Sequence, residues 1–454
     1  MAVIWARQAL TEKGWQDDVQ VILDDRGRIG SVESGRPKEG HEVGILLPAP
    51  VNAHSHAFQR AMAGLTERRG ADPKDSFWTW RRLMYRFLDR LTPDHIEAIT
   101  AFVQMEMLEA GYAASVEFHY LHHAQGGRPY ARLAETSERV VAAAAQSGIG
   151  LTLLPVFYQH GGCDGRALAG GQRRFGNDPD RFARLFEQAK TALDHLPDDA
   201  RIGVAAHSLR AAPKEHLASL AGLAEAGPVH MHLAEQVAEV EEIETAFGQR
   251  PVAWLLDHVA VDDRWCLIHC TQMLPEETTA LARTGAIAGL CPITESSLGD
   301  GIFDGVRWMA AGGRIAIGSD SNIRVALAEE LRTLEYSQRL RDRSRAALAT
   351  PDKSTGRRLF DAIVKGGAGA ARRDSGRIAV GALADLTALD HDAVDLVDKR
   401  GDTVLDSFIF AGDDRMITDV WCAGRHQVRE GCHIAQKDIT DRYLRTMTDL
   451  RDSL

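Results

Sequence analysis

The chain has 454 residues, of which 44% are hydrophobic, and a formal net charge of −11. It is long enough for one large domain plus a smaller unit, because an α/β barrel typically takes about 250 residues. No apolar run approaches the roughly 18 residues that a membrane span needs, and the first residues lack the pattern of a signal peptide. The acidic balance argues against nucleic acid as a partner. We therefore expect neither a membrane nor a nucleic-acid partner.

Six cysteines are scattered along the chain without a CxxC pair. This usage indicates reduced thiols in the cytoplasm rather than a disulfide framework or a thiolate zinc site. Histidine is the unusual residue type, with 18 copies, several of them closely spaced. Because most histidines in a protein of this size are structural or exposed, only their arrangement is informative.

Short apolar and β-branched runs bounded by Gly, Pro and Asp recur along the chain and predict eight strands. In chain order these runs begin at Ile45, Ala114, Gly150, Arg201, Pro228, Trp265, Gly285 and Arg314. Helical periodicity marks stretches between them, for example residues 92–110, 137–146, 180–196 and 237–247. Alternating strands and helices give parallel strands, so eight repeats predict an α/β fold, a (β/α)8 TIM-type barrel over residues 46–376.

The two ends of the chain differ from this repeating pattern. Residues 1–45 and 377–454 contain Gly-bounded strands and little helix, apart from a helical tail over about the last 20 residues. We expect them to form one small flanking β-sandwich domain built from both termini. Residues 161–176, rich in Gly and Arg, predict a long loop over the mouth of the barrel.

Histidines and one aspartate lie where four of the predicted strands end. His54 and His56 share one face of the first strand, since side chains two residues apart point the same way. His232 ends the fifth strand, His269 the sixth and Asp320 the eighth. Each alone has a structural explanation, such as a buried histidine bonding a carbonyl or an aspartate capping a helix. Together they converge where barrel active sites lie, and imidazoles with a carboxylate predict a site for zinc or a similar ion.

This arrangement resembles the amidohydrolase superfamily. The terminal segments strengthen the resemblance through Ala384-Asp-Leu and the later Val420-Trp-Cys-Ala-Gly-Arg. One departure is Pro48-Ala-Pro before the first histidine pair, where many members have Pro-Gly. The resemblance implies a metal-dependent barrel hydrolase with a companion sandwich.

The resemblance also implies how many ions the site holds. Dinuclear members need a carboxylated lysine at the end of the fourth strand, but residues 206–209 read Ala-His-Ser-Leu. His232 is instead followed by Glu235 at the HxxE spacing of the mononuclear deaminase branch. One divalent ion, zinc, is thus implied, held by His54, His56, His232 and Asp320. The implied catalytic residues are Glu235, His269 and Asp320, whereas His230 is expected to belong to the core.

This set of residues predicts a hydrolytic mechanism. The bound ion lowers the pKa of water so that hydroxide exists near neutral pH. Asp320 and His269 can accept the proton and orient the attack. Glu235, when protonated, can hydrogen-bond the substrate's imine nitrogen and pass a proton toward the departing ammonia. A dry pocket favours this protonated form, because burial raises the pKa of a carboxyl group.

A further group of polar residues lies on the predicted mouth loops and bears on the substrate. The group comprises Gln59, Arg60, Arg81, Arg82, Tyr120, His207 and Arg210. A single arginine is usually solvated or paired at the surface. Two arginines on separate mouth loops, however, suggest bidentate recognition of carboxylates, which a nucleobase pocket would not need.

These stretches resemble the N-formimino-L-glutamate deiminases of histidine degradation over essentially the whole chain. The motifs that carry this resemblance are His56-Ala-Phe-Gln-Arg, Ser76-Phe-Trp-Thr-Trp-Arg, Glu117-Phe-His-Tyr, His207-Ser-Leu-Arg and Leu298-Gly-Asp-Gly. Hydrolysis of N-formimino-L-glutamate to N-formyl-L-glutamate and ammonia is implied. Arg81 and Arg210 would bind the two carboxylates, with Arg82 able to replace Arg81. Gln59, Tyr120 and His207 would donate further hydrogen bonds, and we expect a homodimer.

Two other functions stay open at this point. One is a nucleobase aminohydrolase with the same metal chemistry, which turnover of neutral heteroaromatic substrates would favour. The other is a non-enzymatic scaffold derived from the same fold. Retention of every metal ligand and of Glu235 argues against the scaffold.

Overall fold

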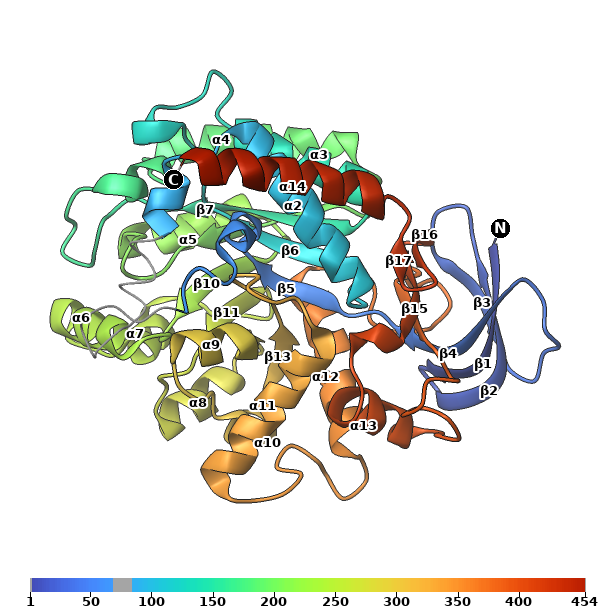
Figure 1. Cartoon of the computed structure of the whole chain (residues 1–454). Helices are drawn as coiled ribbons and strands as arrows, with labels where there is room; N and C mark the ends of the chain where they lie inside the picture. Colours follow the sequence, from blue (N-terminus) through green and yellow to red (C-terminus); the bar gives the residue numbers. More distant parts are fainter. Residues whose placement is uncertain (1, 68–83, 454) are drawn as a thin grey trace.

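The architecture is a parallel barrel joined to a separate sheet, as seen in a computed structural model that describes residues 2–67 and 84–453 (Figure 1). The barrel strands follow one another in the order β13-β12-β11-β10-β9-β7-β6-β5, and β8 pairs with β7. Their bounds are β5 Val51–Ser55, β6 Ala114–His119, β7 Gly150–Phe157, β8 Arg201–Ile202, β9 Val204–Ala206, β10 Val229–Leu233, β11 Trp265–His269, β12 Ile287–Leu290 and β13 Arg314–Ile317. This confirms the predicted eight-stranded parallel barrel.

The barrel closes between its first and last strands through the residue Asp320, which follows β13. The amide of Asp320 donates to the carbonyl of His54 at 2.9 Å, and the amide of His56 donates to the carbonyl of Asp320 at 2.9 Å. Ser55 and Asp320 form a parallel bridge. The circular sheet therefore brings the ends of β5 and β13 into direct contact.

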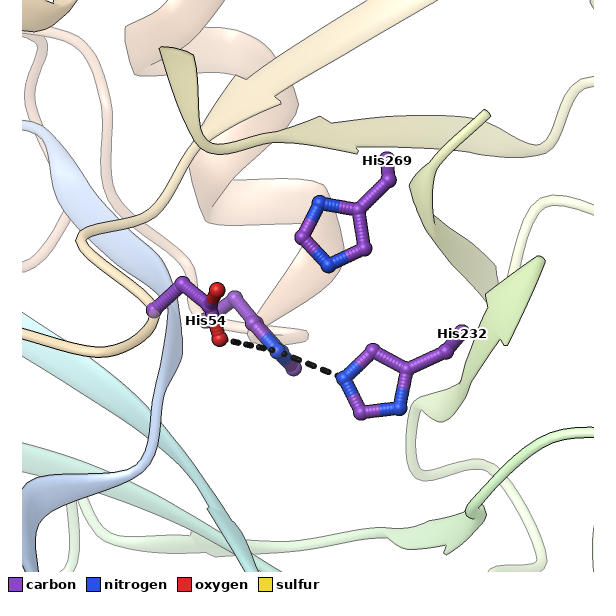
Figure 2. A group of neighbouring side chains, drawn as sticks. His54, His232 and His269 are labelled. Atoms are coloured by element: carbon purple, nitrogen blue, oxygen red, sulfur yellow. Dashed lines mark hydrogen bonds and ion pairs between the residues drawn. The ribbon is translucent and has the colours of Figure 1, made fainter. Parts of the chain in front are cut away.

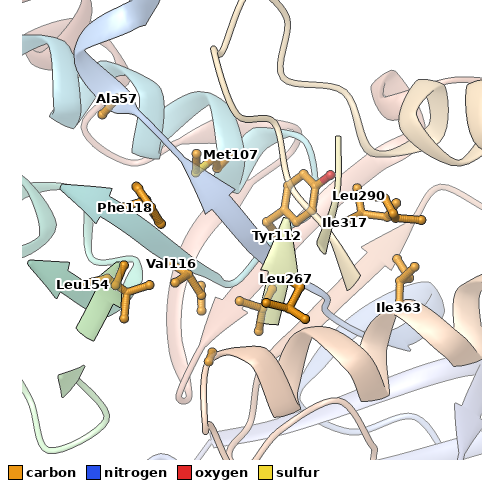
Figure 3. Close-up of a cluster of buried hydrophobic side chains, with 14 of the residues drawn as sticks. Ala57, Met107, Tyr112, Val116, Phe118, Leu154, Leu267, Leu290, Ile317 and Ile363 are labelled. Carbon is orange, nitrogen blue, oxygen red and sulfur yellow. The ribbon is translucent and has the colours of Figure 1, made fainter. Parts of the chain in front are cut away.

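The barrel interior and the space under the helices are filled by buried apolar side chains. Every residue of β6, β7, β10, β11 and β12 is buried, as expected for parallel strands covered on both faces. Figure 3 shows Val116, Leu154 and Leu267 from the strands, together with Ile363 from the helix α12 (Thr355–Ala370). This continuous core fixes the strand ends that carry the polar residues.

Helices surround the barrel where helical periodicity predicts them. Those on the first half are α2 Pro93–Glu109, α3 Glu135–Ser147, α4 Pro179–Ala192 and α5 Leu217–Leu223. The second half has α6 Val237–Phe247, α7 Pro251–His258, α8 Pro275–Ala282, α9 Pro292–Leu298, α10 Gly305–Ala310 and α11 Leu327–Asp342. Thr92 caps α2 by accepting from the His95 amide, and Pro93 begins the helix where a missing N–H costs nothing. No helix in the described part is long and apolar enough to cross a membrane.

The second sheet contains strands from both termini in the order β17-β16-β15-β14-β4-β1-β2-β3. Its strands are β1 Ala2–Thr11, β2 Gly14–Leu23, β3 Ile29–Glu33, β4 His41–Pro48, β14 Leu386–Leu389, β15 Ile417–Cys422, β16 Arg425–Arg429 and β17 Cys432–His433. The N-terminal and C-terminal strands meet where β4 pairs with β14. The predicted sheet built from both termini is thereby confirmed, whereas the domain boundaries at 45 and 377 stay a prediction.

Two local expectations differ from the structure. The first barrel strand was expected to begin at Ile45, but residues 45–48 belong to β4 of the terminal sheet and the barrel strand begins at Val51. Pro48 and Pro50 lack backbone donors, so a continuous central strand cannot run through them. The C-terminal segment also contains the nine-residue helix α13 Asp402–Phe410. The helical tail is present as α14 Gln436–Ser453, which lies against α2 (Figure 1).

A buried ion network joins the barrel to the terminal sheet. Arg373, 1% exposed in its side chain, donates from Nε to Asp385 at 2.5 Å and from Nη2 to Asp199 at 2.8 Å. Asp199 also accepts from Arg425 of β16 at 2.7 Å. Because burial removes water from these charged groups, their ion pairs must compensate for the lost hydration.

The first prediction concerns this network. Replacing Arg373 by Met should lower the free energy of unfolding by about 3–5 kcal/mol, since it leaves Asp199 and Asp385 buried with less compensation. Urea unfolding monitored by far-UV circular dichroism measures the change. The control is Arg377→Met, which removes an exposed pair with Asp374 and should cost no more than about 1 kcal/mol. Equal losses in the two variants would contradict a structural role for the buried network.

Candidate active site

Four side chains from the ends of two barrel strands, β5 and β10, and from the segment after β13 converge at the carboxyl end of the barrel. The Nε2 atoms of His54 and His232 lie 3.1 Å apart. The Asp320 Oδ1 atom lies 3.3 Å from His54 Nε2 and 3.2 Å from His56 Nε2. Figure 2 shows His54 and His232 pointing toward each other, with His269 beside them. The structure therefore brings together all four residues expected to hold an ion.

The imidazoles are held with one ring nitrogen facing this cluster. His56 Nδ1 lies 3.0 Å from the carbonyl of Phe118, and His232 Nδ1 lies 2.9 Å from the carbonyl of His207. A carbonyl only accepts, so each Nδ1 carries a hydrogen and each Nε2 faces the cluster, where it can bind an ion whenever it carries no proton. Metal-binding histidines are typically oriented by such a bond from the other ring nitrogen.

The charge state of the cluster also suits a cation. Burial lowers the pKa of His54 to about 3 and that of His232 well below its ordinary value. Burial alone would raise the pKa of Asp320, but hydrogen bonds from His54 and His56 hold it well below its usual range. Bonds of ~2.0–2.1 Å at tetrahedral angles place ligand atoms roughly 3.3 Å apart. The observed separations of 3.1–3.3 Å fit this arrangement.

His269 and Glu235 form the next part of the site. The His269 Nε2 atom lies 4.0 Å from Glu235 Oε1, while its Nδ1 atom lies 3.3 Å from Glu295 Oε1. Burial opposes a charge on His269, yet these carboxylates raise its pKa to about 10. Burial also raises the pKa of Glu235. A ring nitrogen of His269 lies within 4.8 Å of the ligand atoms of His54, His232 and Asp320, so these four residues form a group of possible ion ligands that does not include His56.

Strained backbone occurs at several of the same strand ends. Non-glycine residues with positive φ there are Ala234 (50°), His269 (71°), Cys270 (53°), Asp320 (47°) and Asn322 (53°). A buried hydrogen-bond chain stabilises the last two: Asn52 donates to Ser319 at 2.7 Å, and Ser319 donates to Asn322 at 2.6 Å. Such conformations persist where surrounding contacts over-determine them, typically at functional sites.

A cavity beside the cluster contains four of the five residues expected to bind substrate. It is lined by Gln59, Tyr120, His207 and Arg210, together with the candidate catalytic groups. Gln59 Nε2 donates to the Tyr120 hydroxyl at 2.7 Å, and Gln59 Oε1 is buried with no hydrogen-bond partner among the described residues. Burial acts to lower the pKa of Arg210, but Glu239 and other nearby groups keep it above its usual value. Arg81 and Arg82 lie outside the described residues.

Several residues that shape the site were missed by the sequence argument. Tyr158 and Phe175 line the cavity, and the Tyr158 hydroxyl accepts from Gln172 at 3.0 Å. Tyr158 directly follows β7, so the strand-end rule could have found it. Glu295 lies within α9 and has no such signal. His230, expected in the core, is fully buried and its Nε2 bonds the Ala370 carbonyl at 2.8 Å.

Comparisons with known families and curated proteins agree with this geometry. Residues 45–426 match the model of the amidohydrolase family, and residues 1–43 match the model of the formimidoylglutamate deiminase HutF N-terminal domain. A formimidoylglutamate deiminase from Pseudomonas aeruginosa is 45% identical over 100% of both chains. A 5-methylthioadenosine/S-adenosylhomocysteine deaminase from Natronomonas pharaonis is 26% identical over 80% of this chain and 77% of that protein.

Solved structures show the same fold. An amidohydrolase from Brucella melitensis is 46% identical and superposes with a TM-score of 0.95, covering 99% of this chain and 100% of that one. An adenosine deaminase from Xanthomonas campestris, solved with bound zinc, is 21% identical with a TM-score of 0.83, covering 99% and 98%. The second likeness supports the fold alone.

The second prediction tests the ligand cluster. Asp320→Asn should weaken divalent-metal binding by about 100-fold or more, because it removes the anionic ligand that compensates the cation. Metal content after purification and competition with a chromogenic chelator measure the loss. Glu239→Gln is the matched control, since Glu239 is a buried carboxylate that accepts from the Glu235 amide outside the cluster. Full metal retention in Asp320→Asn, or equal loss in both variants, would contradict the assignment.

Proposed function

The chain belongs to the amidohydrolase family, and from this premise we propose that it hydrolyses N-formimino-L-glutamate to N-formyl-L-glutamate and ammonia in histidine degradation. The observation that carries the proposal is a buried arginine, Arg210, in the same cavity as Glu235 and the four-ligand cluster. A guanidinium on the wall of the cavity can bind an anionic group of a substrate through charge-assisted hydrogen bonds. The full-length likeness to a formimidoylglutamate deiminase supports the same substrate.

We assign the metal site to His54, His56, His232 and Asp320 and propose that it holds one zinc ion. When bound, a divalent ion supplies the Lewis acidity that lets water act as a nucleophile near neutral pH. The donor set of neutral imidazoles and one carboxylate suits zinc. A single ion is proposed because residues 206–209 at the end of β9 offer no lysine for a second one.

The residues around the cluster have separable roles in moving protons. Asp320, held ionised by His54 and His56, accepts the proton of the attacking water. His269, fixed at Nδ1 by Glu295, orients the water and stabilises the negative charge that develops on its oxygen. Glu235, whose pKa is raised by burial, hydrogen-bonds the imine nitrogen and gives its proton to the nitrogen that leaves as ammonia. The nitrogen leaves as ammonia once the proton held by Asp320 also reaches it, and the hydroxyl proton of the addition intermediate returns to Glu235 as the carbonyl forms. Water thus replaces the terminal nitrogen of the formimino carbon, and every proton is accounted for.

Substrate binding is proposed to depend on the polar side of the cavity. Arg210 pairs with one glutamate carboxylate and Arg81 with the other, each by parallel hydrogen bonds. Tyr120 and His207 supply further hydrogen bonds. The buried amide oxygen of Gln59 can accept an N–H of the formimino group, which would satisfy an otherwise unpaired polar atom.

A second candidate function is deamination of a neutral heteroaromatic compound. Its support is the aromatic part of the cavity wall, which includes Tyr120, Tyr158 and Phe175, and the name of the Natronomonas relative. The buried guanidinium of Arg210 in the cavity wall disfavours it, because a neutral ring would gain no charge-assisted ion pair from that residue. A non-enzymatic scaffold is disfavoured by the complete ligand cluster.

We also propose a cytoplasmic location and a homodimer. All six cysteines, each in the described part of the chain, are free thiols, and free thiols persist in reducing compartments. The homodimer stays a prediction, which light scattering of the purified protein would check.

The third prediction tests the reaction itself. Purified, metal-loaded protein should release one equivalent of ammonia per N-formimino-L-glutamate consumed, with N-formyl-L-glutamate as the other product. Coupled ammonia assays and proton NMR follow the two products. Guanine should release no ammonia, and N-formimino-L-aspartate should react more slowly because its second carboxylate is one methylene closer. Turnover of neutral heterocycles without turnover of N-formimino-L-glutamate would move the second candidate to the front.

The fourth prediction separates binding of the carboxylates from the chemistry. Arg210→Met should lower kcat/KM by about two to three orders of magnitude, since loss of a buried charge-assisted pair costs ~2–4 kcal/mol. Arg81→Met should act similarly if each arginine binds one carboxylate. Metal content should not change in either variant.

A substrate without carboxylates serves as the control for these variants. Simple formamidines should react slowly with the wild-type protein and at nearly the same rate with Arg210→Met, because they make no contact with the guanidinium. Wild-type efficiency of both arginine variants on N-formimino-L-glutamate would refute the proposed carboxylate pocket.

A further inference from the structure

We propose that Arg60 is a positioning residue for the substrate cavity and that the C-terminal helix α14 supports it through α2. Arg60 lies in the short 3-10 helix η1 (Ala57–Met62), which directly follows His56 and also carries Gln59. The inference rests on the proposed function, since it concerns how Gln59 is held toward the substrate.

Arg60 points away from the cavity and is held by α2. Its Nε donates to Glu106 Oε2 at 2.7 Å and its Nη2 donates to Glu106 Oε1 at 2.8 Å, which is a bidentate pair. The hydrogen bonds with Glu106 raise the pKa of Arg60 despite its partial burial. Two parallel bonds fix the orientation of a planar guanidinium as well as its distance. The pair therefore fixes the rotation of η1 about its own axis.

The same guanidinium lies over an aromatic pair that includes the C-terminal helix. The Arg60 Cζ atom is 5.6 Å from the ring centre of Phe102, one helical turn before Glu106 on α2. The rings of Phe102 and Tyr443 of α14 are stacked, with centroids 3.9 Å apart and planes 7° from parallel. Arg60, Phe102 and Tyr443 thus form a continuous contact from the active-site turn to the C-terminal helix.

Helix α14 is itself firmly attached to α2, so it can act as a support. Ile439 is 1% exposed and packs in a cluster with Ala101 and Met105. Arg442 donates to Glu97 at 2.6 Å. At the start of the helix, Gln436 donates to Glu109 at 2.9 Å. Glu97 and Glu109 lie on either side of the Phe102–Glu106 turn of α2, so their bonds fix α14 without involving η1.

The contact between Arg60 and α2 affects the substrate cavity because Gln59 and Arg60 are adjacent residues whose side chains point in opposite directions. Gln59 is 4% exposed and reaches inward to Tyr120, whereas Arg60 reaches outward to Glu106. A helix of six residues has few hydrogen bonds of its own, so side-chain contacts on both sides decide its orientation. Releasing the outer contact allows η1 to rotate and carries the Gln59 amide away from the substrate position.

Kinetics and amide exchange of Arg60→Met test the proposal. We expect KM for N-formimino-L-glutamate to rise about fivefold or more while kcat changes less than about twofold and metal content stays at the wild-type level. Amides of residues 57–62 should exchange faster with deuterium in the substrate-free protein. Arg60→Lys, which keeps the charge but loses the bidentate geometry, should fall between Met and wild type. The proposal is overturned if neither KM nor the exchange rate rises in Arg60→Met. It is also overturned if kcat falls by the same factor as KM rises.

Variants of α14 distinguish positioning from general destabilisation. Tyr443→Ala should raise KM in the same direction as Arg60→Met, while Tyr443→Phe keeps the stacked ring and should match wild type. The matched control is Arg442→Met, which removes an ion pair of the same helix without touching η1 and should leave KM unchanged. A KM increase in Arg442→Met equal to that in Tyr443→Ala would overturn the specific path through Phe102.

The exchange measurement also separates this inference from the proposed function. If the wild-type protein fails to act on N-formimino-L-glutamate, the proposed function is wrong, but faster exchange at residues 57–62 in Arg60→Met still supports the positioning role. If the wild-type protein acts as proposed and exchange and KM are unchanged in Arg60→Met, only the positioning role is wrong.

Discussion

Two backbone hydrogen bonds, from Asp320 to His54 and from His56 to Asp320, close the barrel. The side chains of these three residues form most of the proposed ligand cluster. Closure of the barrel and the proposed ion binding therefore depend on the same residues. Any shift between β5 and the end of β13 would disturb both the backbone hydrogen bonds and the positions of the proposed ligands. The positive φ of Asp320 and the Asn52–Ser319–Asn322 chain are the local consequence of this double requirement.

Burial sets the protonation states of this cluster. It also makes the ionised Asp320 carboxylate unfavourable in free energy unless a cation compensates its charge. Burial lowers the pKa values of His54 and His232 and so favours their neutral forms, while the carboxyl group of Asp320 stays ionised. A cation at this position would bind the imidazole nitrogens and offset the negative charge of the buried Asp320 carboxylate. The same dry environment raises the pKa of Glu235. Burial of the site is therefore expected to favour both the proposed ion binding and the proposed proton donation by Glu235.

Much of the site could be predicted because strand periodicity is simple. Side chains two apart share a face, so His54 and His56 were expected to meet His232 and Asp320 at the barrel mouth, and they do. Glu295 was missed because its contact with His269 depends on the path of α9. Gln59 and Arg60 both follow the His54–His56 pair in the sequence. No sequence pattern shows that Arg60, unlike Gln59, turns outward to Glu106. Tertiary packing, rather than local propensity, decides both cases.

The pairing of β4 with β14 has a consequence during synthesis on the ribosome. Residues 41–48 cannot acquire this neighbour until residues 386–389 have been made. At a translation rate of about 5–20 residues per second, the edge of β4 stays unpaired for roughly 20–70 s while the ribosome makes the barrel segment. An uncovered strand edge is a template for wrong pairing. Newly made chains that stall within the barrel segment are therefore expected to aggregate through their amino-terminal sheet.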